Sequence, residues 1–135
     1  MRQIQGTLYF DQIPKGTAQM KRVNHKTGSF FAGKDVRLAH DLYMNALYEY
    51  APEKPFEGPL SLGFIFSYSV KDKKKQGQPK TSRPDCDNLV KLVMDVMTEL
   101  GFFLDDAQVT KLRIEKRWSL HERANVYFNL EEVVE

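Results

Sequence analysis

Residues 84–101, PDCDNLVKLVMDVMTELG, decide the fold because they predict a long buried helix with an acidic start. Pro84 is typical of a first helical turn, and Gly101 is typical of the position just after a helix ends. The apolar side chains form two stripes, Leu89, Leu92, Val93, Val96 and Leu100 on one side and Val90, Met94 and Met97 on another. A helix that is apolar on two sides is sandwiched in a core or at an interface. For so small a chain we favour a twofold dimer contact, with burial inside the monomer as the alternative.

The rest of the chain predicts strands and one further helix around this segment. The clearest strand pattern spans residues 58–70, where an apolar side chain recurs at every second position. Further strands are expected at residues 3–10, 109–118 and 124–130, and a helix at residues 34–50. No linker or repeat indicates a second domain. We therefore predict a single domain, residues 1–135, of the α+β class, with a small mixed sheet and helices packed on it.

Composition places the chain among ordinary globular proteins. Apolar residues make up 41% and charged residues 28%, close to the average values. No run approaches the roughly 18 apolar residues of a membrane span, and the N-terminus lacks the apolar core of a secretory signal. Cys86 is the only cysteine, so no intrachain disulfide can form. We therefore expect a cytoplasmic protein that makes no membrane contact.

The net charge of +2 hides blocks of opposite sign in the second half of the chain. Residues 71–83 hold six basic side chains against one acid, namely Lys71, Lys73, Lys74, Lys75, Lys80 and Arg83. Residues 84–106 hold six acids against one lysine, and residues 107–123 are basic again. An acidic island between basic flanks suits an enzyme that binds a polyanion with the help of cations. Two solvated charged faces are the alternative interpretation.

The basic blocks indicate where phosphates would be contacted. Residues 71–82 lack apolar side chains and contain Gly77 and Pro79, so we expect a mobile loop. A second basic loop is expected between residues 11 and 33, with Lys15, Lys21, Arg22 and Lys26. The strand at 109–118 adds Lys111, Arg113, Lys116 and Arg117.

Carboxylates gather at the start of the acidic helix. Asp85 or Asp87 can cap its backbone N–H groups, and the helix dipole favours acids there, so capping is the simple interpretation. Two aspartates are more than one cap needs, and Lys91 shares a helical face with Asp87. A further pair, Asp105 and Asp106, follows the helix. Carboxylates are the ligands that Mg²⁺ prefers, and a nearby lysine would stabilise negative charge developing at a phosphodiester.

Other metal and nucleophile chemistries fit less well. Val90 stands where a calcium EF-hand loop needs glycine. His25, His40 and His121 are dispersed and show no zinc-ligand spacing with Cys86, so surface or packing roles are favoured for them. Cys86 has no histidine close in sequence to act as a base, which favours a structural role.

Two motifs together resemble a known family. Residues 84–91 read PDCDNLVK, and residues 101–109 read GFFLDDAQV. This combination resembles the signature of RusA-type Holliday junction resolvases over about the last two-fifths of the chain. The resemblance implies an intertwined homodimer that binds four-way DNA junctions and makes paired symmetrical nicks with Mg²⁺ or Mn²⁺, in DNA recombination and repair.

The resemblance also implies roles for individual residues. It assigns metal binding to Asp85, Asp87 and Asp106, catalysis to Lys91 and an accessory part to Asp105. The chain departs from the family's pattern upstream, where the turn at residues 14–17 lacks an asparagine and Pro84 separates Arg83 from the first aspartate. These departures concern the preferred junction sequence more than the chemistry.

The length of the acidic helix bears on how the acids meet. About fifteen residues at 1.5 Å rise put its ends roughly 20 Å apart. Five residues then lead from Leu100 to Asp106, and five extended residues reach at most about 18 Å, so a return within one chain is strained. If two such helices pack antiparallel across a dimer axis, Asp106 of one chain approaches Asp85 and Asp87 of the other. We therefore hypothesise active sites shared between subunits.

Other functions stay open at this point. The chain can be a metal nuclease for flaps or other branched DNA, a DNA-binding dimer without catalysis, or a structural dimer whose acids only cap a helix. The acids argue against a pure binder, because carboxylates repel phosphates unless cations intervene. Phe102, Phe103 and Trp118 offer rings for stacking on unpaired bases, but core packing is favoured for them.

Overall fold

The structure is a computed structural model that describes residues 2–15, 22–23, 30–31 and 34–133. Of the basic loop expected between residues 11 and 33, Lys21 and Lys26 lie outside the described residues. Within that stretch the structure describes a short antiparallel pairing of β2 (Arg22–Val23) with β3 (Phe30–Phe31). None of the described helices is long and apolar enough to cross a membrane.

Four strands form one mixed sheet in the order β1–β6–β4–β5. Their bounds are β1 Gln3–Phe10, β4 Leu60–Ser69, β5 Val109–Ser119 and β6 Ala124–Glu132. β6 pairs antiparallel with β1 and β4, whereas β4 and β5 run parallel. Parallel neighbours need a crossover, and here the crossover contains the helix α2 (Cys86–Glu99). The expected strands and the α+β class with a mixed sheet are confirmed.

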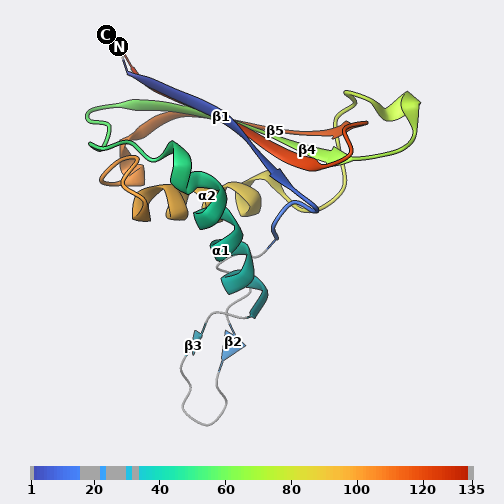
Figure 1. Cartoon of the computed structure of the whole chain (residues 1–135), viewed down its shortest axis with the longest axis horizontal. Helices are drawn as coiled ribbons and strands as arrows, with labels where there is room; N and C mark the ends of the chain where they lie inside the picture. The colour runs from blue at the N-terminus through green and yellow to red at the C-terminus, as the bar shows by residue number, and fades with distance from the viewer. Residues whose placement is uncertain (1, 16–21, 24–29, 32–33, 134–135) are drawn as a thin grey trace.

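Two helices lie on the same face of this sheet (Figure 1). The helix α1 (Lys34–Leu47) continues into the 3₁₀ helix η2 (Tyr48–Tyr50), so the helix expected at residues 34–50 is confirmed with a tighter last turn. The layer between sheet and helices is filled from alternate strand positions, because successive side chains of a strand point to opposite faces. On β4 these are Leu60, Leu62, Phe64 and Phe66, each at most 1% exposed.

Both apolar stripes of α2 are buried inside the single chain. The buried side chains include Leu89, Val90, Leu92, Val93, Met94, Val96 and Met97. The sheet covers one side of the helix and α1 contacts it on another (Figure 1). The dimer contact that we favoured for this helix is therefore wrong, because elements distant in sequence already cover both stripes.

The C-terminal end of α2 is closed as its sequence predicts. Gly101 has φ +80°, its N–H donates to Thr98 O at 3.1 Å, and the Phe102 N–H donates to Met97 O at 3.0 Å. This is the Schellman arrangement, in which glycine accepts the left-handed backbone. Phe102 and Phe103 that follow are 0% and 1% exposed, which confirms core packing for these two rings.

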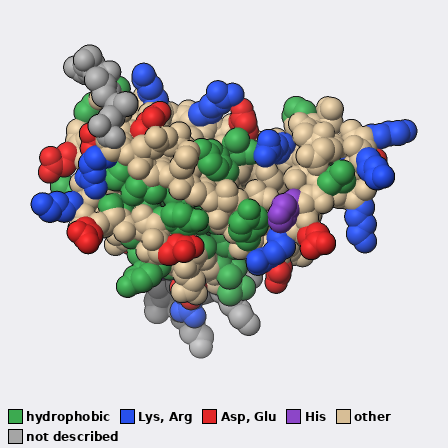
Figure 2. All heavy atoms as spheres, turned by 45° about the horizontal axis from the view of Figure 1, so that its top comes forward, with side chains coloured by type: hydrophobic (Ala, Val, Ile, Leu, Met, Phe, Trp, Pro, Cys, Tyr) green, Lys and Arg blue, Asp and Glu red, His purple; other side chains and the backbone are tan. Residues whose placement is uncertain are grey.

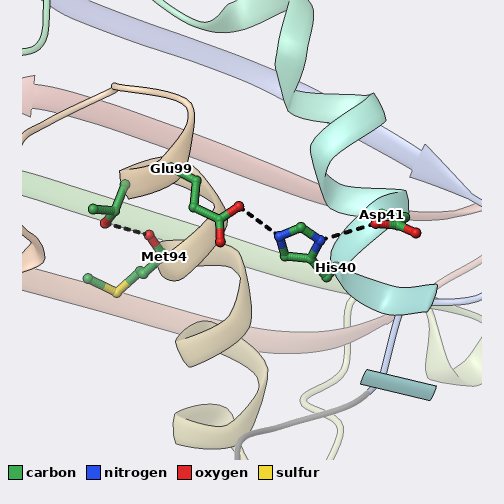
Figure 3. A network of polar contacts seen from close by, with 5 residues as sticks. His40, Asp41, Met94 and Glu99 are labelled. Atoms are coloured by element: carbon green, nitrogen blue, oxygen red, sulfur yellow. Dashed lines mark hydrogen bonds and ion pairs between the residues drawn. The ribbon is translucent and has the colours of Figure 1, made fainter. Parts of the chain in front are cut away.

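A histidine joins the two helices near this end (Figure 3). The His40 ring lies between Glu99 of α2, 2.7 Å from its Nε2, and Asp41 of α1, 3.2 Å from its Nδ1. The hydrogen bond to Glu99 is the main cause that raises the pKa of His40 above its ordinary value of 6.5. His40 therefore has a packing role between helices, as the sequence favoured.

Candidate active site

Asp85 and Asp87 are exposed at the start of α2. Asp85 occupies the N-cap position with extended backbone, and its carbonyl accepts the Leu89 N–H at 3.1 Å. Its side chain nevertheless accepts no capping hydrogen bond from the described helix. Asp87 lies in the first turn, and its carboxylate has no partner among the described residues. Capping hydrogen bonds therefore do not account for these two carboxylates.

Lys91 is exposed one helical turn after Asp87. Residues four apart share a helix face, so the ammonium and the carboxylate lie on the same side of α2. Lys91 takes part in none of the ion pairs found among the described residues. Its neighbours Val90 and Leu92 are buried in the core, which fixes the helix that carries it.

Two lysines hold the backbone that leads into the first aspartate. Lys116, on β5, donates from Nζ to the carbonyl oxygens of Ser82 at 2.7 Å and Pro84 at 2.8 Å. Lys80 donates to the Ser82 hydroxyl at 2.8 Å, to the Ser82 carbonyl at 3.2 Å and to the Arg83 carbonyl. Three consecutive carbonyls thus accept charge-assisted hydrogen bonds, which are stronger than neutral ones. We call Lys80 and Lys116, with the three carbonyls that they bind, the lysine clamp. Its hydrogen bonds hold the backbone that leads into α2.

Lys80 was expected to contact a phosphate, but its side chain is buried in the structure. It is 8% exposed, and its Nζ lies 4.7 Å from the ring centre of Tyr68 and 5.2 Å from that of Trp118. Burial, and secondarily the charge of Lys116, lower the pKa of Lys80. We correct the expectation for Lys80, because a buried ammonium already bonded to the backbone is poorly placed to meet a phosphate. Lys116 also commits its ammonium to backbone oxygens.

The second acid pair lies beyond the other end of α2. Asp105 caps the 3₁₀ helix η4 (Asp106–Gln108), and its carboxylate accepts the Ala107 N–H at 2.8 Å. Gln108 Oε1 completes this capping box by accepting the Asp105 N–H at 3.1 Å. Asp106 is exposed, and its carboxylate has no partner in the part of the chain that the structure describes. Asp105 therefore has a structural role that the sequence motif did not reveal.

The helix keeps the two acid pairs apart. α2 has 14 residues and spans about 21 Å, with Asp85 before its first residue and Asp106 beyond its last. Among the described residues, no three acidic, histidine or cysteine side chains are grouped so that they could hold a metal ion. Within one chain, Asp85 and Asp87 share one helix end and Asp106 lies outside that pair.

Residues 71–78 form an exposed basic arm, and the mobility expected of this loop stays a prediction. The arm contains the 3₁₀ helix η3 (Lys73–Lys75), and its exposed lysines are Lys71, Lys73, Lys74 and Lys75. Its base is tied to β5, since Gly77 N donates to Trp118 O at 2.9 Å and Trp118 N donates to Gln78 O at 3.0 Å. Basic side chains project at the right of Figure 2, where this arm lies.

The other basic candidates are also exposed. Arg83 lies between the basic arm and α2, and Lys111, Arg113 and Arg117 lie along β5. Arg113 pairs with Glu115 at 2.7 Å, and Arg117 Nε donates to Ser67 Oγ at 3.1 Å. These contacts occupy part of each guanidinium, whereas Lys111 and Arg83 side chains have no partner among the described residues.

Sequence reasoning missed a pocket beside the acids. A cavity of about 640 Å³ lies where the ends of β1, β4 and β5 meet the start of α2. Its walls include Ile13, Tyr68, Arg83, Pro84 and Trp118. Trp118 was expected to pack in the core, but it is only half-buried and lines this pocket. The lone tryptophan at the end of a basic strand was the one available signal.

The chain matches the family model described as Endodeoxyribonuclease RusA over residues 12–128. It is 46% identical over 67 residues to the crossover junction endodeoxyribonuclease rusA of Lactococcus phage r1t, which covers 48% of this chain and 51% of that protein. Over 38 residues it is 50% identical to the crossover junction endodeoxyribonucleases RusA of Escherichia coli (strain K12) and Shigella sonnei (strain Ss046), covering 28% of this chain and 32% of each relative. These matches span about half the length of the phage relative and about a third of the bacterial ones.

Proposed function

The chain belongs to the RusA family of endodeoxyribonucleases, and on that premise we propose that it resolves four-way DNA junctions by metal-dependent paired nicks. The observation that carries this proposal is the pair of exposed carboxylates at the start of α2, which make no structural hydrogen bond among the described residues. Residues 1–135 would act as a single endonuclease domain in DNA recombination and repair. A cytoplasmic location stays a prediction.

The exposed acids fit a hard divalent cation. Mg²⁺ is commonly held by one or two carboxylates, with waters and substrate phosphate completing its six ligands. Asp85 and Asp87 offer two such carboxylates from one chain, and we propose that Asp106 adds a third, with Asp105 as an accessory acid. Mn²⁺ is the natural substitute because it also prefers oxygen ligands. When bound, the ion supplies Lewis-acid activation of the phosphodiester.

Lys91 would act on the same side of α2 as Asp87. Its ammonium is exposed and unpaired among the described residues, so it is available to a phosphate brought to the acids. A positive charge placed there stabilises the negative charge that develops on the oxygens in the transition state. We propose Lys91 as the catalytic lysine on this ground.

The basic arm and the basic residues around it would bind the phosphates of the DNA. The exposed candidates are Lys71, Lys73, Lys74, Lys75, Arg83 and Lys111. Each phosphate contact adds affinity that falls with salt because counterions are released. Lys80 is not among these candidates, and Lys116 is proposed to position the acids instead.

A homodimer would complete each site from two chains. The case for it is the separation of Asp106 from Asp85 by the length of α2, together with apolar surface near Asp106. Leu104 is 76% and Leu112 46% exposed, and residues 109–115 of β5 pair with no described strand on their outer edge. We propose that a second copy packs on this surface and brings its own Asp85 and Asp87 to Asp106.

Mixed dimers test the shared site. Chains with Asp85→Asn are combined with chains carrying Asp106→Asn, and each heterodimer is purified with two different tags. A shared arrangement predicts one intact site and one doubly impaired site, so each junction receives a single nick, whereas neither homodimer cuts. Heterodimers as inactive as the two homodimers would mean that each site lies within one chain.

The function itself is tested on a synthetic four-way junction beside a linear duplex and a flapped duplex. Paired nicks in the junction with Mg²⁺, none with EDTA and none from Asp85→Asn would support the proposal. Preferential cutting of the flap would make the chain a nuclease for other branches. Junction binding without cutting by the unmodified protein would leave a DNA-binding dimer, and the catalytic assignment of the acids would be withdrawn.

A further inference from the structure

The pocket at the start of α2 is directly continuous in sequence with the proposed metal ligands. Arg83 and Pro84 line it and immediately precede Asp85. Tyr68 and Ser69 at the end of β4, and Trp118 at the end of β5, form its other walls. Its volume of about 640 Å³ lies within the range of about 300–1,000 Å³ that holds small ligands. Four lining residues, Tyr68, Ser69, Trp118 and Ala124, lie on strands of the sheet, and the others lie on segments 11–15 and 80–84.

The walls combine aromatic and apolar surface with one buried cation, Lys80, whose ammonium lies over the rings of Tyr68 and Trp118, and with further cations at the rim. Ile13 is 6% exposed, and the rings of Tyr68 and Trp118 pack edge to face with centres 6.4 Å apart. Lys15 and Arg83 are exposed and line the same cavity. The one acid in the lining, Asp11, lies 3.7 Å from the guanidinium of Arg123, which offsets its charge.

This chemistry suits a nucleotide better than a phosphate alone. The exposed lysines of the basic arm already offer phosphate contacts that need no cavity. A nucleobase, in contrast, has an apolar face that aromatic walls accommodate, and contacts of this kind tolerate any base. Paired duplex keeps its bases stacked, whereas the branch point of a junction can release one base to a pocket.

We propose that this pocket receives one unpaired nucleotide of the junction strand, next to the phosphate cut at Asp85 and Asp87. Its base would contact Trp118 and Tyr68, and its phosphate would face Arg83 and Lys15. This inference rests on the proposed junction-cleaving function and extends it, because it gives the enzyme a means of recognising an unpaired base at the branch.

Trp118 is the only tryptophan of the chain, so its fluorescence reports on the pocket directly. The unmodified protein is titrated in EDTA with four-way junctions in which a single abasic site is stepped across the cleaved position. The intact junction is expected to change the Trp118 emission. One abasic position is expected to abolish that change and to weaken binding by about 5- to 150-fold, the range that base–aromatic contacts contribute.

A relocated reporter is the matched control. In Trp118→Phe/Tyr48→Trp the tryptophan moves to a position that is 74% exposed on η2 and outside the lining of the pocket. Its emission should not depend on the abasic position.

The outcomes separate this inference from the proposed function. If the junction is cut with Mg²⁺ but the Trp118 emission responds equally to every abasic position, the pocket does not bind a base and this inference is overturned, while the proposed function stands. If the junction is neither bound nor cut, both are overturned. Loss of the signal at one position, with cutting intact in the undamaged junction, supports the pocket as a nucleotide site.

Discussion

The two ends of α2 carry the same residue type in different structural circumstances. At the first end, Asp85 and Asp87 are exposed and their carboxylates make no hydrogen bond among the described residues, although Asp85 sits where a capping side chain would serve the helix. At the far end, Asp105 closes a complete capping box. The capping hydrogen bond is a sufficient structural reason for an aspartate at position 105. An acid without one, on a backbone held by two lysines, is the better candidate for binding a metal ion.

The largest expected effect is a loss of cleavage when an aspartate at the start of α2 is replaced. Asp85→Asn should lower junction cleavage by at least about 100-fold, because loss of groups that merely support a ligand already costs 10- to 100-fold. Its melting temperature should stay within about 1 °C of the unmodified protein, since no described hydrogen bond is lost. Single-turnover experiments measure the cleavage rate, and thermal unfolding measures the melting temperature. A variant that unfolds at clearly lower temperature would give Asp85 a structural role after all.

The next effect concerns the clamp that positions the same end. Lys116→Met removes the donor to Ser82 and Pro84, so cleavage of bound junction should fall by about 10- to 100-fold. Affinity for the junction in EDTA should barely change. Lys73→Met is the matched variant, because it should weaken binding and reduce the salt slope by about one while sparing cleavage of the bound junction.

Lys116→Arg keeps the charge and donors and should restore part of the lost cleavage. A salt slope that falls in Lys116→Met as it does in Lys73→Met would show that Lys116 contacts a phosphate. The hydrogen bonds of Lys116 to the backbone would then not explain the loss of cleavage.

A smaller effect, on stability, distinguishes Asp105 beyond the C-terminal end of α2 from Asp85 at its start. Asp105→Ala should lower the free energy of unfolding by about 1 kcal/mol, the typical cost of removing a capping side chain. Asp85→Ala should cost far less, because its side chain makes no such bond in the described structure. Urea unfolding of both variants measures the difference. Equal losses would contradict the division of roles between the two ends.

The smallest effect is a pH dependence at the contact between α1 and α2. The hydrogen bond to Glu99 raises the pKa of His40, so the protonated pair stabilises the fold fully below the ordinary value of 6.5 and its contribution is lost as the pH rises through the higher folded value. Melting temperatures should therefore differ between the unmodified protein and Glu99→Gln at about pH 5.5 and converge near pH 8.5. A difference that persists at high pH would contradict this origin.

The strands and helices could be predicted because their signals are local. The alternation from Leu60 to Phe66 and the glycine at 101 act through neighbours within a few residues, and both are found as expected. The acids and Lys91 were also visible in sequence, because a helix relates residues four apart without further information. The motif could not distinguish the capping Asp105 from the exposed Asp106, since the cap depends on the turn that Gln108 closes.

The sequence by itself therefore determined the elements, the α+β class and the acidic start of α2. Only the tertiary structure decided what covers that helix, because α1 and the sheet come from segments far from it in the chain. It also decided that Lys80 and Lys116 face backbone carbonyls rather than solvent, and that Trp118 lines a pocket. The physical reason is that charge and apolarity belong to a side chain, whereas burial and partners belong to the segments that folding brings beside it.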